Sequence, residues 1–238
     1  MTRPPAADPL ITWFGDGCLR VEFAAEPPTI ALARVHSAFA TLRARPVPGL
    51  SDLTPAYRTL LLTFDAATLE HERAESQVRD SLREAVEQSV GVGGREVQVP
   101  ACYDPAFAPD LDPLCRELGM TPEQLAHAHA GAAYTVAFIG FSPGFPYLVG
   151  LPERLHAPRH PSPRVRVEPG SIGIAGDQCG IYPQATPGGW RIIARTPLRL
   201  FDATGPIPAM LEPGDVVRFA PITAAKFHEL AAVERKGG

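Results

Sequence analysis

The stretch from residue 138 to residue 202 decides the fold of this chain. It contains, in order, the segments FIGFSPGFPYL (138–148), PSPR (161–164), GIAGDQCGIYP (173–183), PGGW (187–190) and RTPLRLFD (195–202). Short runs rich in Val, Ile and aromatic residues are interrupted repeatedly by Gly and Pro, which disfavour a helix interior. The stretch therefore predicts short strands joined by tight turns, as in an all-β barrel.

The polar side chains of this stretch gather near its turns. Arginine offers a planar fork for a carboxylate, glutamine can donate to and accept from an amide, and Tyr and Trp provide flat apolar walls. We predict a small-molecule site on the barrel loops, formed by Arg164, Asp177, Gln178, Tyr182 and Trp190. A structural role is nearly as well supported, with Arg164 bound to barrel carbonyls and Trp190 in the core.

The order and spacing of these motifs resemble the family of KipI and the B-type subunits of 5-oxoprolinase, also labelled allophanate hydrolase subunit 1 and related to carboxyltransferase domains. The resemblance includes FSPGFPYL (141–148), AGDQ (175–178), IYP (181–183) and PGGW (187–190), and extends to GDGCLRVEF (15–23), PAYRTLL (55–61) and CYD (102–104). It covers nearly the whole chain. It implies that the C-terminal half has a cyclophilin-like β-barrel fold.

The N-terminal residues predict a separate α+β domain. Strands are expected at 10–14, 18–23, 49–53, 57–64 and 95–99, with helices after the first hairpin and over 66–90. This order favours a ferredoxin-like sandwich in residues 1–100. Residues 101–132 are expected to form two bridging helices, the first starting at Asp112-Pro113 and the second at Thr121 with a capping box to Gln124. Residues 133–238 then form the barrel and a C-terminal helix.

Composition excludes several classes of function. The 238 residues carry 22 basic and 26 acidic side chains, so there is no overall attraction to nucleic acid or to an anionic membrane. Four separated cysteines, with no signal peptide and no membrane-length apolar run, predict a reduced, cytoplasmic protein. No metal site is expected, because His156 and His160 flank Pro158 in a loop and His127 and His129 face different directions on a helix. Cys179 lies beside the polar set and is not expected to be a catalytic thiol.

The resemblance also implies a function. The chain would be one component of an ATP-dependent 5-oxoprolinase that converts 5-oxo-L-proline to L-glutamate, assembled with a C-type and an A-type subunit. ATP and Mg²⁺ would act in the assembled complex, because this chain has no P-loop and its only lysines are Lys226 and Lys236. No catalytic residues can be named. Two alternatives stay open: a KipI-type inhibitor of a sensor histidine kinase, and a carboxyltransferase-like role in urea or allophanate metabolism.

The aromatic residues of the 138–148 segment have two possible roles. Phe141, Phe145 and Tyr147 are spaced by Pro and Gly, which would hold them rigidly as an anchor for a partner subunit. The same spacing also suits a small satellite core. We expect the partner interface to lie here.

Overall fold

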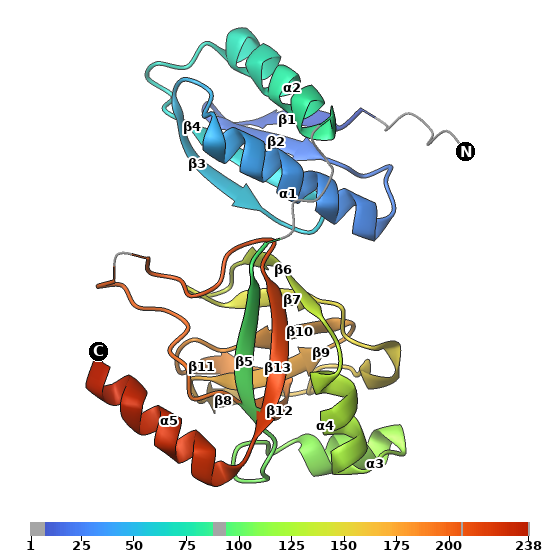
Figure 1. Cartoon of the computed structure of the whole chain (residues 1–238). Helices are drawn as coiled ribbons and strands as arrows, with labels where there is room; N and C mark the ends of the chain where they lie inside the picture. Colours follow the sequence, from blue (N-terminus) through green and yellow to red (C-terminus); the bar gives the residue numbers. More distant parts are fainter. Residues whose placement is uncertain (1–7, 88–93, 206, 238) are drawn as a thin grey trace. The chain divides into compact units, whose positions relative to one another are not determined.

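The computed structural model of the chain describes residues 8–87, 94–205 and 207–237. The chain divides into two compact units, Met1–Gly93 and Gly94–Gly238 (Figure 1). No helix within the described residues combines the length and the apolar character needed to cross a membrane.

The first unit is a four-stranded antiparallel sheet with two helices. The strands run in the order β1-β2-β4-β3, and the elements are β1 (Leu10–Phe14), β2 (Cys18–Glu22), α1 (Pro28–Ala44), β3 (Leu50–Pro55), β4 (Thr59–Phe64) and α2 (His71–Glu87). Alternate residues of the central strands, such as Leu19, Val21, Leu60 and Leu62, are fully buried. Burying one face of a sheet under helices is the usual way to complete such a layer. The predicted end of α2 near residue 90 lies outside the described residues.

The ferredoxin-like order predicted for this unit is wrong. The strand expected to close its sheet, residues 95–99, belongs to β5 (Glu96–Cys102), which pairs in parallel with β13 (Val216–Ile222) in the second unit. The first unit therefore has the element order ββαββα. The alternating apolar residues of β5 fit either sheet equally well, and its partner lies more than a hundred positions away, beyond the reach of a local pattern.

The second unit contains the predicted barrel, and the structure confirms that it is closed. The seven strands, all within the described residues, follow the order β10-β7-β6-β13-β5-β12-β9, and all neighbours except β13 and β5 are antiparallel. The remaining strand bounds are β6 (Tyr134–Ile139), β7 (Pro146–Val149), β9 (Ser171–Ala175), β10 (Gln178–Ile181) and β12 (Arg191–Arg195). A separate two-stranded sheet pairs β8 (Arg164–Val167) with β11 (Thr186–Gly188).

Alternation along β10 separates an interior from an outer face. Cys179 and Ile181 belong to the main barrel core, whereas Tyr182 belongs to a smaller cluster. Gly180 lies under Phe145, and a Cβ at this position would come within 2.7 Å of the Phe145 ring. Since side chains alternate along a strand, Gln178, Gly180 and Tyr182 share the outer face.

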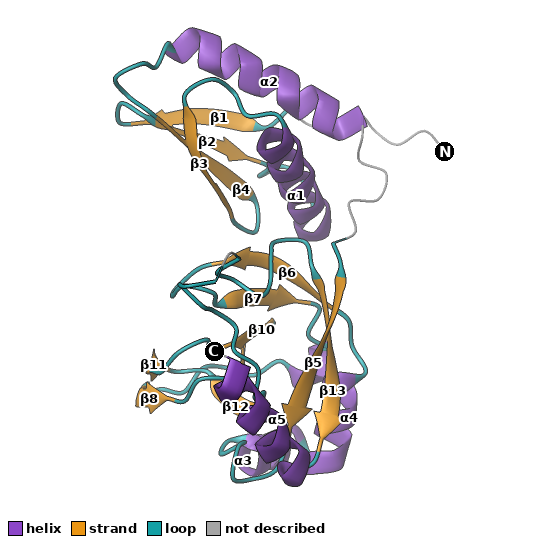
Figure 2. Cartoon of the chain, turned by 60° about the vertical axis from the view of Figure 1, so that its left-hand side comes forward, coloured by secondary structure: helices purple, strands orange, loops and turns teal. Residues whose placement is uncertain are grey.

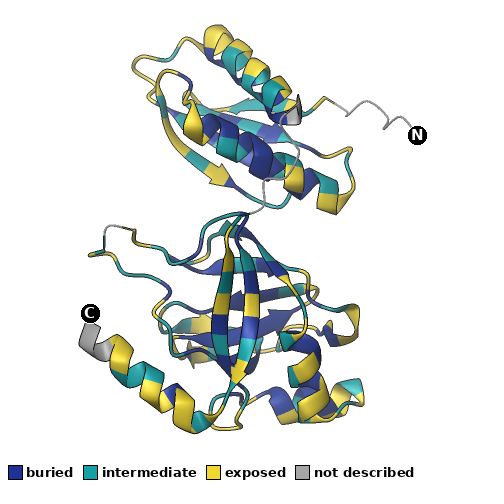
Figure 3. Cartoon of the chain, viewed as in Figure 1, coloured by how far each residue is buried: buried dark blue, intermediate teal, exposed yellow. Residues whose placement is uncertain are grey.

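Helices cover the barrel, as Figure 2 shows. They are α3 (Leu111–Leu118), α4 (Pro122–Ala130) and α5 (Ala224–Gly237), with a short 3-10 turn at Glu153–Leu155. Leu114 and Leu125 are fully buried in the barrel core, so α3 and α4 are part of this unit rather than a bridge to it (Figure 3). The capping box of Thr121 and Gln124 is confirmed. For α3, however, the N-cap is Asp110 instead of Asp112, and the Asp110 side chain makes no capping bond.

Candidate functional site

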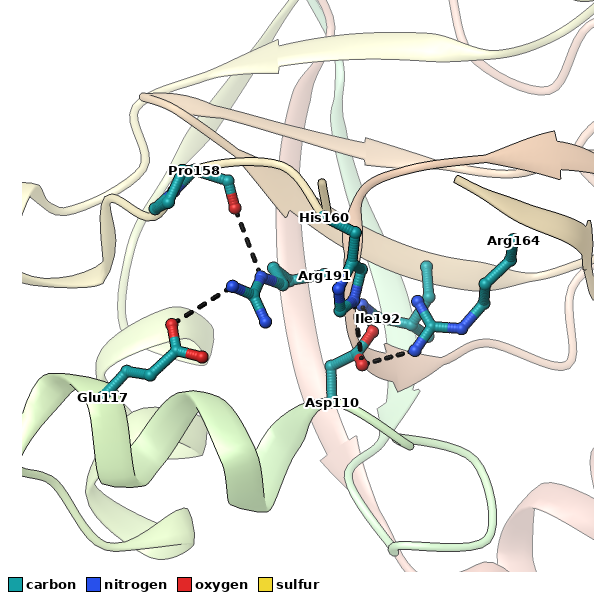
Figure 4. A network of polar contacts seen from close by, with 7 residues as sticks. All are labelled: Asp110, Glu117, Pro158, His160, Arg164, Arg191 and Ile192. Carbon is teal, nitrogen blue, oxygen red and sulfur yellow. Dashed lines mark hydrogen bonds and ion pairs between the residues drawn. The ribbon is translucent and has the colours of Figure 1, made fainter. Parts of the chain in front are cut away.

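Asp110 is the centre of a buried polar network on the barrel unit (Figure 4). Its side chain is nearly inaccessible, and Oδ2 accepts a hydrogen bond of 2.7 Å from the Ile192 backbone N–H. Arg164 Nη2 donates to Oδ1, which also lies 3.1 Å from His160 Nε2. This explains why Asp110 does not cap α3, since its carboxylate is engaged by β12, β8 and the 156–163 loop.

A second arginine extends the network along the same loop. Arg191 Nε donates to the Pro158 carbonyl at 3.2 Å, and Nη2 donates to Glu117 of α3 at 3.2 Å (Figure 4). The His160 backbone N–H bonds to the Gly189 carbonyl at 2.8 Å. The 156–163 loop is thereby held to both α3 and β12. His160, expected to be a surface loop residue, is half-buried in this network.

Two of the predicted substrate contacts, Tyr182 and Trp190, meet in one aromatic cluster. This Tyr182 cluster consists of Phe145, Val167, Ala175, Tyr182, Trp190 and Ile192. Tyr182 and Trp190 are 1% and 5% exposed, so both are packing residues in this chain. Burial is the main reason that the pKa of Tyr182 is raised, although a backbone hydrogen bond from Trp190 opposes the shift. Arg159 lies over the Trp190 ring, 5.8 Å from its centroid.

Arg164 approaches this cluster from β8. Its charge acts on Tyr182, and Val167 of the same strand is a member of the cluster. Arg164 is nevertheless engaged by Asp110 through Nη2, while its buried Nη1 has no hydrogen-bond partner within the described residues. The guanidinium therefore has one nitrogen bound to Asp110 and one that is buried without a hydrogen-bond partner.

Gln178 and Asp177 lie at the other end of β10. Gln178 pairs with Ala175, a cluster member, across the hairpin whose turn uses Gly176 at a φ of 61°. Tyr182 lies four positions after Gln178, just beyond the end of β10, a distance of about 13 Å along an extended chain. Asp177 is exposed at the turn, and Gln178 is half-buried. The five predicted contacts therefore surround the Tyr182 cluster without meeting in a single group.

The predicted partner-facing aromatics have two different environments. Phe145 is 1% exposed and packs against Tyr182 and Trp190 with ring centroids 5.2 and 5.5 Å apart. Phe141 is 62% exposed and has a φ of 63°, an uncommon backbone conformation for a residue with a side chain. Tyr147 is half-buried and stacks on Phe138 at 4.5 Å. Phe145 is a core residue, and Phe141 is the aromatic presented to solvent.

A polar group inside the barrel was not expected from any sequence pattern. His129 is fully buried, with Nδ1 2.7 Å from the Tyr103 hydroxyl and Nε2 3.5 Å from Cys179 Sγ. Burial lowers the pKa of His129 to about 3 and raises the pKa of Cys179. The expectation that Cys179 lies beside the polar set is wrong, because its side chain belongs to the main core. A neutral histidine and a protonated thiol at this position form a structural contact.

The described residues do not fit a bound metal or a phosphate loop. They contain no group of three His, Cys, Asp or Glu side chains that could hold a metal ion. Lys226 is exposed on α5, where it is paired with Glu229 at 2.8 Å.

Comparison with known proteins gives the family. The sequence profile described as "Carboxyltransferase domain, subdomain C and D" matches residues 9–211. The B-type 5-oxoprolinase subunit of Bacillus subtilis is 35% identical over 228 residues, covering 92% of this chain and 95% of that protein. The chain therefore belongs to the carboxyltransferase-domain family that this profile describes. The B-type 5-oxoprolinase subunit of Escherichia coli O157:H7 is 42% identical over 176 residues, which are 74% of this chain and 76% of that protein.

Solved structures in the comparison share the fold. The protein TTHA0988 aligns with a TM-score of 0.76 at 32% identity, covering 86% of this chain and 40% of that one. This chain thus spans well under half of that longer protein. The urea carboxylase of Kluyveromyces lactis aligns with a TM-score of 0.73 at 19% identity, over 99% of this chain and 24% of that protein. At this identity the likeness concerns the fold alone.

Proposed function

We propose that this chain is the B-type component of an ATP-dependent 5-oxoprolinase, which converts 5-oxo-L-proline to L-glutamate together with A-type and C-type subunits. The observation that carries the proposal is the match to a B-type 5-oxoprolinase subunit over 92% of this chain and 95% of the relative. ATP and Mg²⁺ act in the assembled complex.

Reconstitution tests this proposal. The chain and the A-type and C-type proteins encoded in the same genome are purified separately and supplied with Mg-ATP and 5-oxo-L-proline, and glutamate is measured. Glutamate is expected from the three proteins together and from no mixture that omits this chain. Full activity without the chain, or no activity from the complete set, would contradict the assignment.

The exposed part of the aromatic segment supports a partner surface there. A rigid aromatic side chain that is open to solvent is a frequent anchor of protein interfaces. Phe141 is such a side chain. The centroid of its ring lies 5.4 Å from that of the buried Phe145, and this contact restricts the movement of the Phe141 side chain. In this proposal Phe141 contacts the C-type subunit, with Tyr147 at the edge of the contact.

Co-purification of the tagged C-type subunit with variants tests this interface. Phe141→Ala removes an exposed ring and should weaken capture without affecting folding. Val233→Ala, which removes an exposed apolar side chain from α5 in the same unit, is the matched control. Phe145→Ala is less suitable, because it opens a cavity in the core. Equal capture of the Phe141 variant, the Val233 variant and the unmodified chain would assign Phe141 no role in the interface.

Within the same proposal, the substrate is held jointly by the two subunits. Buried Tyr182 and Trp190 form the supporting wall, and the contacts from this chain are the partly exposed guanidinium of Arg164, the amide of Gln178 and, at the turn, Asp177. Arg164→Lys in the reconstituted enzyme should raise the KM for 5-oxo-L-proline more than it lowers kcat, because a point charge replaces a planar fork. Arg166→Lys is the control, since Arg166 lies exposed on the same strand and is paired with Glu168. Identical kinetics in both variants would remove Arg164 from the substrate site.

A further inference from the structure

A cavity lies beside α5 on the barrel unit, and none of the residues predicted to bind substrate lines it. Its volume is about 540 Å³, within the range typical of small-molecule sites. Part of its wall comes from the end of β12 and the following segment, including Arg195 and Arg199, and part from Phe227, His228 and Glu234 of α5. Figure 1 shows α5 as the red helix beside the barrel.

One wall of the cavity is aromatic. Phe107 and Phe227 have ring centroids 4.2 Å apart, and His228 lies 5.6 Å from Phe107. Three prolines, Pro169, Pro183 and Pro197, form further parts of the lining. Because proline fixes its own φ, these parts of the wall are largely preformed, which reduces the ordering cost of binding.

Arg195 provides a positioned cation at this wall. Its Nε donates to the Pro169 carbonyl at 2.8 Å, and its guanidinium carbon lies 5.8 Å from the centroid of the Phe227 ring. Neither Nη group has a hydrogen-bond partner among the described residues. Burial lowers the pKa of Arg195 below its ordinary value, because the charged guanidinium loses part of its hydration. An anion bound to the guanidinium would compensate for this lost hydration.

The other charges around the cavity are mostly compensated within the chain. Arg199 is paired with Asp202 at 3.0 Å. Glu168, which also acts on Arg195, is hydrogen-bonded to Arg166 at 2.7 Å. His228 and Glu234 are exposed on α5. Arg195 is therefore the cation of this wall that has no dedicated carboxylate within the described part of the chain.

We propose that this cavity binds a small organic anion, in which a carboxylate or phosphate group is attached to a flat or apolar body. The anionic group is bound by the two Nη groups of Arg195, since a guanidinium fits both oxyanions with paired hydrogen bonds. The flat body lies against Phe107 and Phe227. The site is independent of the proposed function, and its α5 residues lie beyond the family match at residues 9–211.

Calorimetric titration of the full chain tests the proposal. Benzoate and phenyl phosphate are the anionic probes, and benzamide is the neutral probe of the same shape. Both anions should bind saturably, and benzamide should bind at least roughly tenfold more weakly, because it lacks the charge-assisted hydrogen bonds. The tighter of the two anions identifies the preferred head group. Absence of saturable binding by both anions would overturn the proposal.

Three variants locate the binding. Arg195→Gln should weaken both anions roughly tenfold to a hundredfold. Ala231→Trp fills the cavity from α5 without changing Arg195, and should weaken benzamide as well as the anions. Arg191→Gln changes an arginine of the same strand that contacts Pro158 and Glu117 instead, and should bind as the unmodified chain does. Binding that survives both cavity variants, or that falls equally in Arg191→Gln, would place the anion elsewhere.

Discussion

Arg164 and Arg195 lie on the same barrel unit, but their guanidinium groups have opposite surroundings. Arg164 is bound to a carboxylate of the chain itself, in the network of Asp110, His160 and the Ile192 backbone. Arg195 is held only through Nε, and its other two nitrogens have no partner among the described residues. The bonding partners of the guanidinium, rather than its position near a turn, therefore distinguish an arginine that also stabilises the fold from one whose two Nη groups are both open to a ligand.

The largest expected effect is the loss of the Asp110 carboxylate. Asp110→Ala leaves the Arg164 charge and the buried Ile192 N–H without their acceptor, and removing one partner of a buried ion pair costs about 3–5 kcal/mol. The free energy of unfolding is measured with urea, following Trp190 fluorescence in a Trp13→Phe background so that the signal comes from the barrel unit. Asp112→Ala, an exposed first-turn acid of α3, is the control and should cost well under about 1 kcal/mol. Equal effects would mean that the network is not stabilising.

A smaller effect is expected from His129, another polar group with internal partners only. Its pKa is about 3 in the folded chain against 6.5 for the unperturbed group. Below pH 6.5 the imidazole is therefore protonated in the unfolded chain but stays neutral in the folded chain. The free energy of unfolding keeps its full value above this pH and decreases as the pH falls towards 3. Between about pH 7 and about pH 5 the loss is about 2 kcal/mol.

Urea unfolding at the two pH values measures this loss. His129→Phe keeps a ring to stack on Phe219 and should show a pH dependence smaller by that amount. His127→Gln, a histidine of the same helix outside the buried contact, should behave as the unmodified chain does. An unchanged pH dependence in the His129 variant would show that the histidine is protonated without cost.

The sequence predicted the parts of this fold that depend on local chemistry. The Gly and Pro spacing of residues 138–202 predicted barrel strands, and Thr121 with Gln124 predicted the start of α4; both are confirmed. The partner of β5 could not be predicted, because Val97 and Val99 alternate in the same way for either sheet. Strand pairing is a long-range choice that the local pattern does not contain.

The candidate site was less predictable for the same reason. Arg164 and Arg195 both stand within two residues of a proline, and nothing nearby in the sequence indicates that Asp110, 54 residues earlier, binds the first. Asp110 itself resembles an ordinary helix cap two residues before Asp112-Pro113. The aromatic residues of the 138–148 segment were predicted to form either an interface or a small core. In the structure Phe145 is buried in the core, whereas Phe141 is exposed.

The smallest effect on stability is expected at Arg195, where the contrast with Arg164 is tested most sharply. Arg195→Gln removes the guanidinium while a Gln amide can still donate towards the Pro169 carbonyl, so little more than the contact with Phe227 is lost. A half-exposed cation over a Phe ring contributes about 0.5–1 kcal/mol to the free energy of unfolding. Removing the charge also removes the cost of burying the Arg195 guanidinium, which offsets part of this loss. The free energy of unfolding should therefore change by less than about 1 kcal/mol, while anion binding falls. Loss of stability comparable to that of Asp110→Ala would instead make Arg195 a second structural clamp, and the two regions would no longer differ.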